Sequence, residues 1–201
     1  MQKGFTLIEI SIAISILAIT VVGIFSAFFV VVILTSDSTD RLTGTYLAQE
    51  GIEIVRNIRD QNWLNMDDCL YNQGNQNCPT WLAGNLDSSS CRLNASGCQA
   101  DYTDSSLESY VSNNYLNIDV NGLYRHESGK QSKFKRKIII EPVVDIINTD
   151  TEHIIKVFVQ VSWDKKGNIL NSAGGTAGDC NPDNCITIIE TLYNWYNDKY
   201  L

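Results

Sequence analysis

The chain has 201 residues, 44% of them hydrophobic, and a net charge of -8. These values suit one globular domain, or a domain with an appendage. An acidic chain is a poor general binder of nucleic acid, because phosphates are held by clustered Lys and Arg. All six cysteines lie after residue 68, which favours an oxidising compartment and disfavours a fully cytosolic protein.

Charge is distributed unevenly along the chain. Lys3 and Glu9 are the only charged residues among the first 34, although the chain has 15 Lys and Arg and 23 Asp and Glu. From Phe5 to Leu34 the sequence is almost entirely apolar and contains no proline. A helix of about 20 apolar residues spans a bilayer, so we expect residues 5–34 to form a transmembrane helix. Lys3 would keep the N-terminus on the cytoplasmic side.

This segment differs from an ordinary secretory signal peptide. Its polar leader, residues 1–4, is very short, and its apolar run is longer than such signals have. Glu9 is a carboxylate inside that run and is costly in lipid. The carboxylate either lies among the lipid headgroups or has a cationic partner.

The residues Gly4-Phe5-Thr6-Leu7-Ile8-Glu9, placed between a short leader and a long apolar helix, resemble the N-terminus of type IV pilins and pseudopilins. The resemblance implies that a prepilin peptidase cuts after Gly4 and that Phe5 is then N-methylated. It also implies that Glu9 pairs with the α-amine of Phe5 on a neighbouring subunit during filament assembly. Many members of the family have a proline at the position of Ser26, so the chain departs from the pattern there.

The helix is predicted to continue beyond the apolar run as an amphipathic segment, residues 35–63. A polar collar at residues 35–40 is followed by a helical pattern over residues 41–62. Apolar residues recur there at helical steps and make one stripe: Leu47, Gly51, Ile54, Val55 and Ile58. Residues 48–60 are also similar to the PilV-like minor pilins.

Residues 64–201 are expected to form an extracytoplasmic globular head. Its first part, to residue 133, is polar and has four cysteines, which indicates stapled loops. Strand patterns follow at residues 135–147, 155–163 and 186–195, with a turn signal at residues 164–167. The predicted fold class is α+β and type IV pilin-like: a long N-terminal helix, transmembrane in its first half, packed on a small antiparallel sheet.

Six cysteines admit many pairings. Close spacing favours three local disulfides: Cys69 with Cys78, Cys91 with Cys98, and Cys180 with Cys185. Zinc is the alternative at Cys180 and Cys185, the one pair with a spacing near that of zinc ligands. Neither histidine, His126 or His153, lies in a metal motif.

Three oxygen-bearing residues at alternate positions, Asp179, Asn181 and Asp183, make a weak calcium candidate. The segment lacks the glycine and the bidentate glutamate of a calcium loop, so a solvated loop is the competing interpretation. Asn94 begins a glycosylation sequon.

Two further groups of side chains have a functional and an ordinary interpretation. A basic run in this acidic chain could hold DNA phosphates, or it could protect a strand edge: Lys130, Lys133, Lys135, Arg136 and Lys137. Aromatic residues could form an adhesive surface or pack in the core: Trp63, Trp81, Tyr102, Tyr110 and Tyr115.

The sequence therefore predicts a structural protein, not an enzyme, with no cofactor and no catalytic motif. It would be a prepilin, a minor subunit of a type IV pilus or of a type II secretion-like pseudopilus. The expected partners are other pilin subunits, the prepilin peptidase, the assembly ATPase, the platform protein and the membrane. The protein would reside in the cytoplasmic membrane and then in an extracellular or periplasmic filament. The alternative is a signal-anchored extracellular binding protein for DNA, a surface or calcium that does not polymerise.

Overall fold

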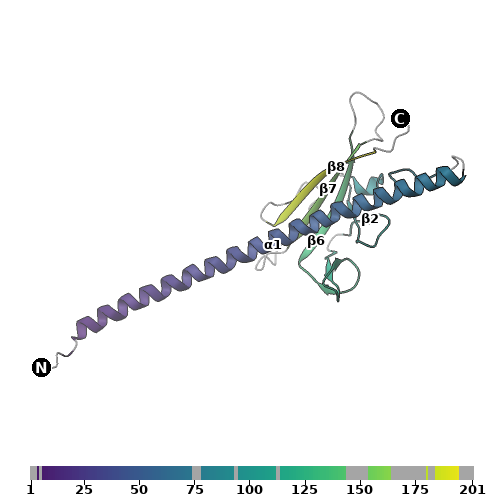
Figure 1. The fold of residues 1–201 in the computed structure, drawn as a ribbon. Helices are drawn as coiled ribbons and strands as arrows, with labels where there is room; N and C mark the ends of the chain where they lie inside the picture. Colours follow the sequence, from purple (N-terminus) through teal and green to yellow (C-terminus); the bar gives the residue numbers. More distant parts are fainter. Residues whose placement is uncertain are drawn as a thin grey trace. The chain divides into compact units, whose positions relative to one another are not determined.

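The structure is a computed structural model, and it describes residues 4, 6–73, 78–92, 95–111, 114–143, 154–163, 180 and 184–194 (Figure 1). The chain divides into two compact units, Met1–Asp40 and Arg41–Leu201. The expected boundaries of leader, transmembrane segment and head, at residues 4, 34 and 63, stay predictions.

Helix α1 spans Leu7–Gln73 and contributes to both units. In the second unit it buries the stripe predicted from the sequence, with Leu47, Ile54, Val55 and Ile58 all in the core. The prediction that the helix ends at residue 62 is wrong, because α1 continues to Gln73. Two contacts support this extension: the ring of Trp63 stacks on Trp81, and a disulfide joins Cys69 to Cys78.

A five-stranded antiparallel sheet forms the centre of the second unit, in the order β2-β1-β6-β7-β8. The long strands are β6 (Phe134–Pro142), β7 (Ile154–Trp163) and β8 (Cys185–Tyr193). They correspond to the three predicted strands, although the predicted residues 144–147 and 195 and the turn at residues 164–167 lie outside the described residues. The first two strands, β1 (Cys98–Gln99) and β2 (Glu108–Ser109), are short.

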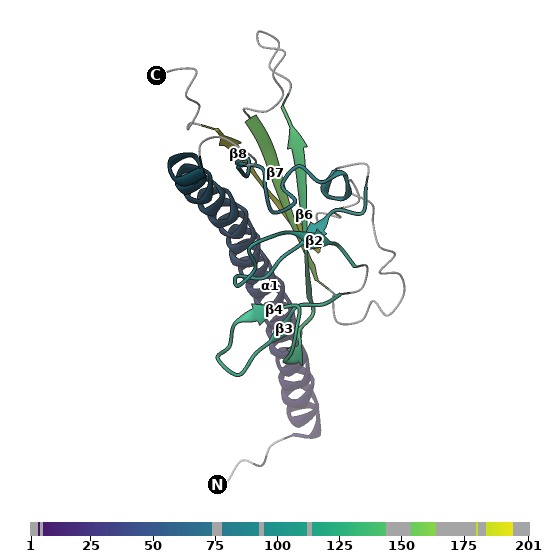
Figure 2. The same ribbon diagram turned by 90° about the vertical axis from the view of Figure 1, so that its right-hand side faces the viewer.

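The helix covers one face of this sheet (Figure 2). Along β7, alternate residues from Ile155 to Trp163 are buried, as strict alternation predicts. Two glycines let the helix approach: a Cβ on Gly51 would lie 2.7 Å from Cγ1 of Val159, and one on Gly44 would lie 3.0 Å from the ring of Trp163. The predicted α+β class is therefore confirmed, with helix and antiparallel sheet sharing one core.

A second, three-stranded sheet in the order β4-β3-β5 belongs to the polar loop region. Its strands are β3 (Asn117–Ile118), β4 (Tyr124–Arg125) and β5 (Lys130–Gln131). A short 3-10 helix, η1 (Ser89–Cys91), lies earlier in the same region. These elements are too short for sequence periodicity to predict.

Candidate processing and assembly site

The predicted cleavage point follows Gly4, the first residue that the structure describes. Gly4 is exposed, and Phe5 and Lys3 lie outside the described residues. The first turn of α1 is capped by Thr6, whose carbonyl accepts from the Glu9 amide at 3.1 Å and from the Ile10 amide at 3.3 Å. The Thr6 Oγ1 lies 3.4 Å from the same Glu9 amide. Glu9 thus occupies the first helical turn, where the helix dipole favours a negative charge.

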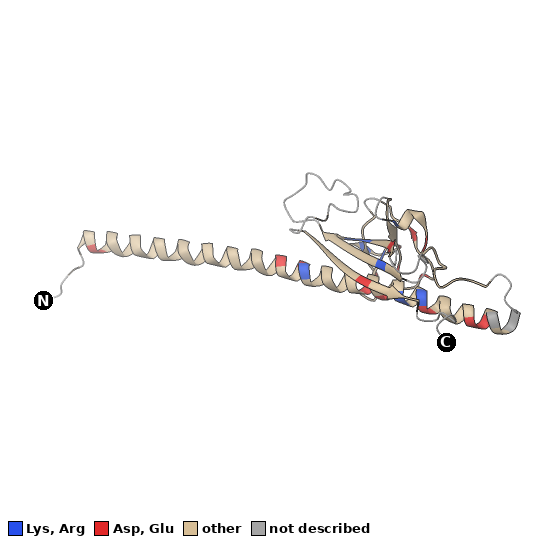
Figure 3. Cartoon of the chain, turned by 90° about the horizontal axis from the view of Figure 1, so that it is seen from above, with Lys and Arg blue, Asp and Glu red and all other residues tan. Residues whose placement is uncertain are grey.

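The surface of the helix over residues 7–34 is apolar and exposed. Every described residue of that stretch is solvent-accessible, including large side chains such as Leu17, Phe25 and Phe28. Figure 3 shows how sparse charge is along this part of the helix compared with the rest of the chain. So much apolar surface is incompatible with water and indicates a lipid or protein environment.

Two hydroxyl groups of this segment, those of Ser15 and Thr20, bond within the helix itself. Ser15 Oγ donates to the Ser11 carbonyl at 2.9 Å, and Thr20 Oγ1 donates to the Leu17 carbonyl at 2.8 Å. Such bonds to the preceding turn let a hydroxyl enter an apolar medium without an unpaired donor. Glu9 is the one charged side chain between residues 7 and 34.

The position of Glu9 raises an energetic question. A helix N-terminus stabilises a carboxylate by about 0.3–1 kcal/mol at an exposed site. A carboxylate deep in a bilayer costs about 2.5–3.5 kcal/mol on insertion scales. The dipole alone does not offset that cost, so Glu9 needs headgroup contact or a cation when the helix enters an apolar environment.

A buried polar network, which the sequence did not reveal, joins three parts of the head. Arg136 on β6 is fully buried, with Nη1 3.2 Å from Glu50 Oε2 on the helix. Its Nη2 donates to the Ala100 carbonyl at 2.9 Å and lies 3.9 Å from Asp101 Oδ1. The Asp101 carboxylate also accepts from the backbone amide of His126 at 2.8 Å and contacts its Nδ1 at 2.7 Å.

These contacts shift the acidity of Asp101. Burial by itself raises the pKa of this carboxyl, but the hydrogen bonds from the side chain and backbone of His126 lower it. The nearby charges of His126 and Arg136 act in the same direction, and the net effect is a pKa below the ordinary value. Asp101 is thus held ionised and neutralises a guanidinium that would otherwise be buried with only Glu50 beside it.

The predicted DNA-binding run does not form one cationic surface. Arg136 lies inside the core, and Lys137 is largely buried, with Nζ 5.5 Å from the ring of Tyr110. Lys135 lies over the ring of Tyr115 at 4.3 Å. Alternation along β6 explains the outcome, because neighbouring residues of a strand point to opposite faces.

The structure contains the three disulfides favoured by the spacing: Cys69–Cys78, Cys91–Cys98 and Cys180–Cys185. The zinc alternative at Cys180 and Cys185 is wrong, because their sulfur atoms are bonded to each other. Among the described residues, no cluster of three or more His, Cys, Asp or Glu is suited to a metal.

Several other candidates lie outside the described residues: the calcium candidates Asp179, Asn181 and Asp183, together with His153 and Asn94.

The adhesive interpretation fails for two of the aromatic residues. Trp63 and Trp81 are buried and stacked, with ring centroids 6.5 Å apart, so they belong to the core. Arg59 lies over the Trp63 ring at 4.4 Å, and Trp63 Nε1 donates to Asn194 Oδ1 at 3.2 Å. Of the remaining three, Tyr102 is exposed.

A model of the prokaryotic N-terminal methylation motif matches residues 1–25. This motif is the signature of type IV pilins and pseudopilins, and the α+β architecture of helix and antiparallel sheet is type IV pilin-like. No curated protein and no solved structure matches the chain significantly. The motif and the apolar helix together indicate a prepilin-processed, membrane-anchored protein.

Proposed function

We propose that this chain is a prepilin that becomes a minor subunit of a type IV pilus or of a type II secretion-like pseudopilus. A prepilin peptidase cuts after Gly4 on the cytoplasmic face, and Phe5 becomes the methylated N-terminus. The mature subunit then polymerises through α1. Its role is structural, as the pilin signature implies.

One observation carries the proposal: Glu9 is the only charge on an exposed apolar helix surface that begins at the methylation motif. In a filament, the α-amine of Phe5 on a neighbouring subunit supplies the missing cation. An α-amine has a pKa of about 8, so it is mostly protonated at neutral pH. Pairing removes the penalty of an isolated charge in an apolar bundle.

Assembly transfers the apolar surface of residues 7–34 from lipid to other subunits. Lipid chains are already apolar, so the hydrophobic gain is small, and packing together with the Glu9 pair must supply the specificity. Extraction from the bilayer therefore needs external work. An assembly ATPase and a membrane platform protein are the partners that would provide it, alongside other pilin subunits and the peptidase.

The experiment replaces Glu9 by Ala in the full chain, in cells that produce the filament. Membrane insertion should be unchanged, because the apolar run remains intact, whereas incorporation into sheared filaments should be lost. Glu53→Ala is the matched control, since Glu53 is a solvent-exposed glutamate on the same helix. That variant should be incorporated normally.

Mass spectrometry of the sheared filaments identifies the processed form. A chain that begins at N-methylated Phe5 supports the proposal. An intact Met1 found only in membranes would support the signal-anchored binding protein instead. Normal incorporation of Glu9→Ala would remove the assigned role of Glu9.

A further inference from the structure

The turn between β3 and β4 contains the one Asn-Gly pair of the chain, Asn121 and Gly122. Both residues are exposed, and so is Val120 before them. A Cβ added at Gly122 would meet no atom within 4 Å, so the space on that side of the glycine is open. Because glycine has no side chain to obstruct the approach, its main-chain nitrogen can come close to the side-chain amide of the preceding residue.

The hydrogen bonds of the turn leave the Gly122 nitrogen weakly held. The Asp119 carbonyl accepts from the Gly122 amide at 3.1 Å. Asp119 Oδ1 accepts from the amides of Asn121 at 2.8 Å and Leu123 at 2.9 Å, and the Asp119 amide donates to the Leu123 carbonyl at 2.9 Å. The Gly122 nitrogen is therefore held by one exposed main-chain bond, and surface turns open at a small cost in free energy.

These two groups support a cyclisation whose only co-reactant is water. Hydroxide removes the proton of the Gly122 amide, and the nitrogen then attacks Cγ of Asn121. The new bond joins that nitrogen to Cγ, while the bond from Cγ to Nδ2 breaks; Nδ2 takes a proton from water and leaves as ammonia, which regenerates the hydroxide. Water opens the resulting succinimide ring at Cγ, which gives aspartate, or at the main-chain carbonyl carbon, which gives isoaspartate.

Either product is poorly compatible with the turn. Hydrogen bonds from the amides of Leu123 and Asn121 and from the Asn121 side chain hold the pKa of Asp119 below its ordinary value, so Asp119 is ionised at neutral pH. A carboxylate in place of the Asn121 amide would repel Asp119 instead of donating to it. Isoaspartate also lengthens the main chain by one carbon between Asp119 and Leu123, which bond to each other across the turn.

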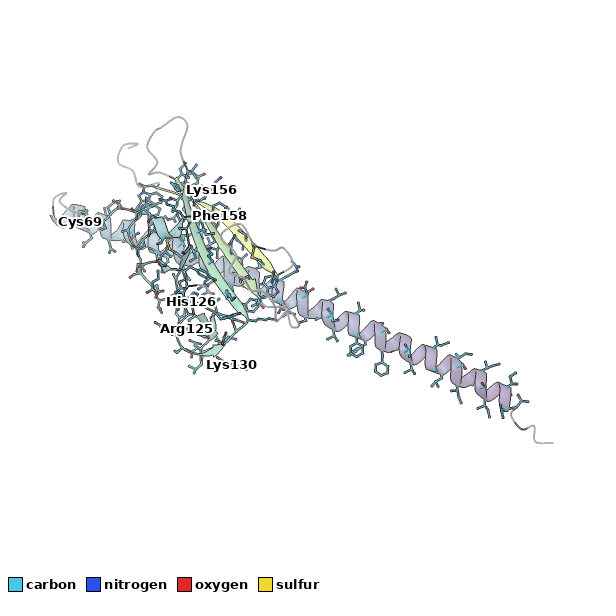
Figure 4. All side chains as sticks on the ribbon, turned by 180° about the vertical axis from the view of Figure 1, so that it is seen from behind. Cys69, Arg125, His126, Lys130, Lys156 and Phe158 are labelled. Carbon is cyan, nitrogen blue, oxygen red and sulfur yellow. A yellow bond between two sulfur atoms is a disulfide. The ribbon has the colours of Figure 1, made fainter. Side chains whose placement is uncertain are left out.

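The β3–β4 hairpin has few contacts with which to resist this change, because the two strands pair over two residues each. The neighbouring segments are held more firmly: the Leu116 amide donates to the Phe134 carbonyl at 2.8 Å, and the Ser132 amide donates to the Leu116 carbonyl at 2.9 Å. Figure 4 shows Arg125 on β4 and Lys130 on β5, the two strands that flank β3, in the same part of the head. Opening would therefore be confined to the hairpin.

We propose that Asn121 is a site of spontaneous deamidation, through a succinimide formed with the Gly122 nitrogen, and that its conversion opens the β3–β4 hairpin. The reaction is slow and proceeds in one direction, so the surface of the head changes with the age of the molecule. It involves residues of the head alone and does not depend on whether the chain polymerises.

The test incubates the full detergent-solubilised chain and follows each asparagine by peptide mass spectrometry. Fragmentation by electron transfer distinguishes isoaspartate from aspartate at position 121. The rate should rise about tenfold per pH unit, because the attacking nitrogen is an amide far below its pKa. Asn117 is the internal control and should stay unconverted, because the branched side chain of Ile118 obstructs the nitrogen that would attack.

Variants separate the chemistry from its consequence. Gly122→Ala should slow the conversion several-fold in the folded chain and also in urea, where the turn has no influence. The unmodified sequence should react about two- to tenfold faster in urea than when folded, because one hydrogen bond of the Gly122 amide must open in the fold. Hydrogen exchange at the Asp119 and Leu123 amides should be faster in aged protein and in Asn121→Asp, whereas exchange at Leu116 should be unchanged.

Four results would overturn the proposal. An Asn121 that converts in urea but not in the folded chain would exclude the site from the native head. Conversion of Gly122→Ala at the unaltered rate, or conversion without isoaspartate, would exclude the succinimide. Equal conversion of Asn117 would assign the change to general hydrolysis. Unchanged exchange at Asp119 and Leu123 after conversion would exclude the opening of the hairpin.

Discussion

The buried network of the head makes a quantitative prediction for Asp101→Asn. The substitution keeps the shape of the side chain but removes the charge that faces Arg136 Nη2 and accepts from His126. Arg136 would remain fully buried with only Glu50 as an ionic partner. Removing one member of a buried ion pair typically costs about 3–5 kcal/mol. Because small domains have only about 5–15 kcal/mol of stability, the loss should be large.

Urea unfolding of the detergent-solubilised chain measures this effect. The four tryptophans all lie after residue 62, so their fluorescence reports on the head and not on the apolar helix. Glu53→Gln is the control, because the Glu53 side chain is 63% exposed and its i,i+3 pair with Arg56 is worth about 0.5 kcal/mol or less. If both variants unfold at the same urea concentration, the network does not stabilise the head as argued.

The pH dependence of the same network has a definite sign. Because the pKa of Asp101 is lowered in the folded state, its carboxylate adds stability that is complete above the ordinary pKa and is lost as pH falls through the folded value. The wild-type head should therefore lose stability below about pH 4, the ordinary range of an aspartate. Asp101→Asn should show a weaker loss over that range, measured by urea unfolding at successive pH values.

Three other changes have expected outcomes. Gly51→Val should destabilise the head by about 1–3 kcal/mol in urea unfolding, because a Cβ at this position would lie 2.7 Å from Val159 Cγ1. Gly23→Val is the control and should leave the stability of the head unchanged, because a Cβ at Gly23 would have no atom within 4 Å. Cys78→Ser should cost about 2–3 kcal/mol for a closed loop of this length and should speed hydrogen exchange in the last turns of α1. Gly122→Ala should cost about 1–2 kcal/mol, since its φ of 83° disfavours a side chain; an unchanged unfolding midpoint would contradict this.

The parts of the fold that the sequence predicted are those with long, regular patterns. The alternation from Ile155 to Trp163 gives both strand β7 and its buried face. The helical stripe from Leu47 to Ile58 gives the face of α1 that packs on the sheet. In β7 the two-residue period of a strand, and in α1 the 3.6-residue period of a helix, persists over enough residues to exclude the other kind of element.

The end of α1 and the short strands could not be predicted in this way. The helix continues past residue 62 because of contacts distant in sequence, such as Trp63 with Trp81, and a local pattern cannot register them. Strands of two residues, such as β1 and β3, are too short to have a period. They form because the surrounding hydrogen bonds and disulfides position them.

Arg136 was predicted as part of a basic surface run and is instead buried, although the alternation along β6 is a signal for its burial. Phe134, Ile138 and Ile140 are buried in the core that faces α1, and Arg136 lies in the same register between Phe134 and Ile138. Extending the alternation through the basic run would have placed Arg136 inside the core. The partners Asp101 and His126 had no comparable signal, because each lies in a segment without periodicity.

The distribution of polar groups along the first helix bears on how a filament would fix its register. Over residues 7–34 the hydroxyls of Ser15 and Thr20 bond to their own helix, so they place no demand on a neighbour. Apolar packing in lipid and in a bundle is similar in strength, so it discriminates weakly between registers. Glu9 differs, because a subunit shifted by one helical turn would leave it without its cation at a cost of about 3 kcal/mol. That cost corresponds to roughly a hundredfold preference for the register in which the pair forms. In the proposed filament, one carboxylate therefore supplies most of the positional information of an otherwise uniform surface.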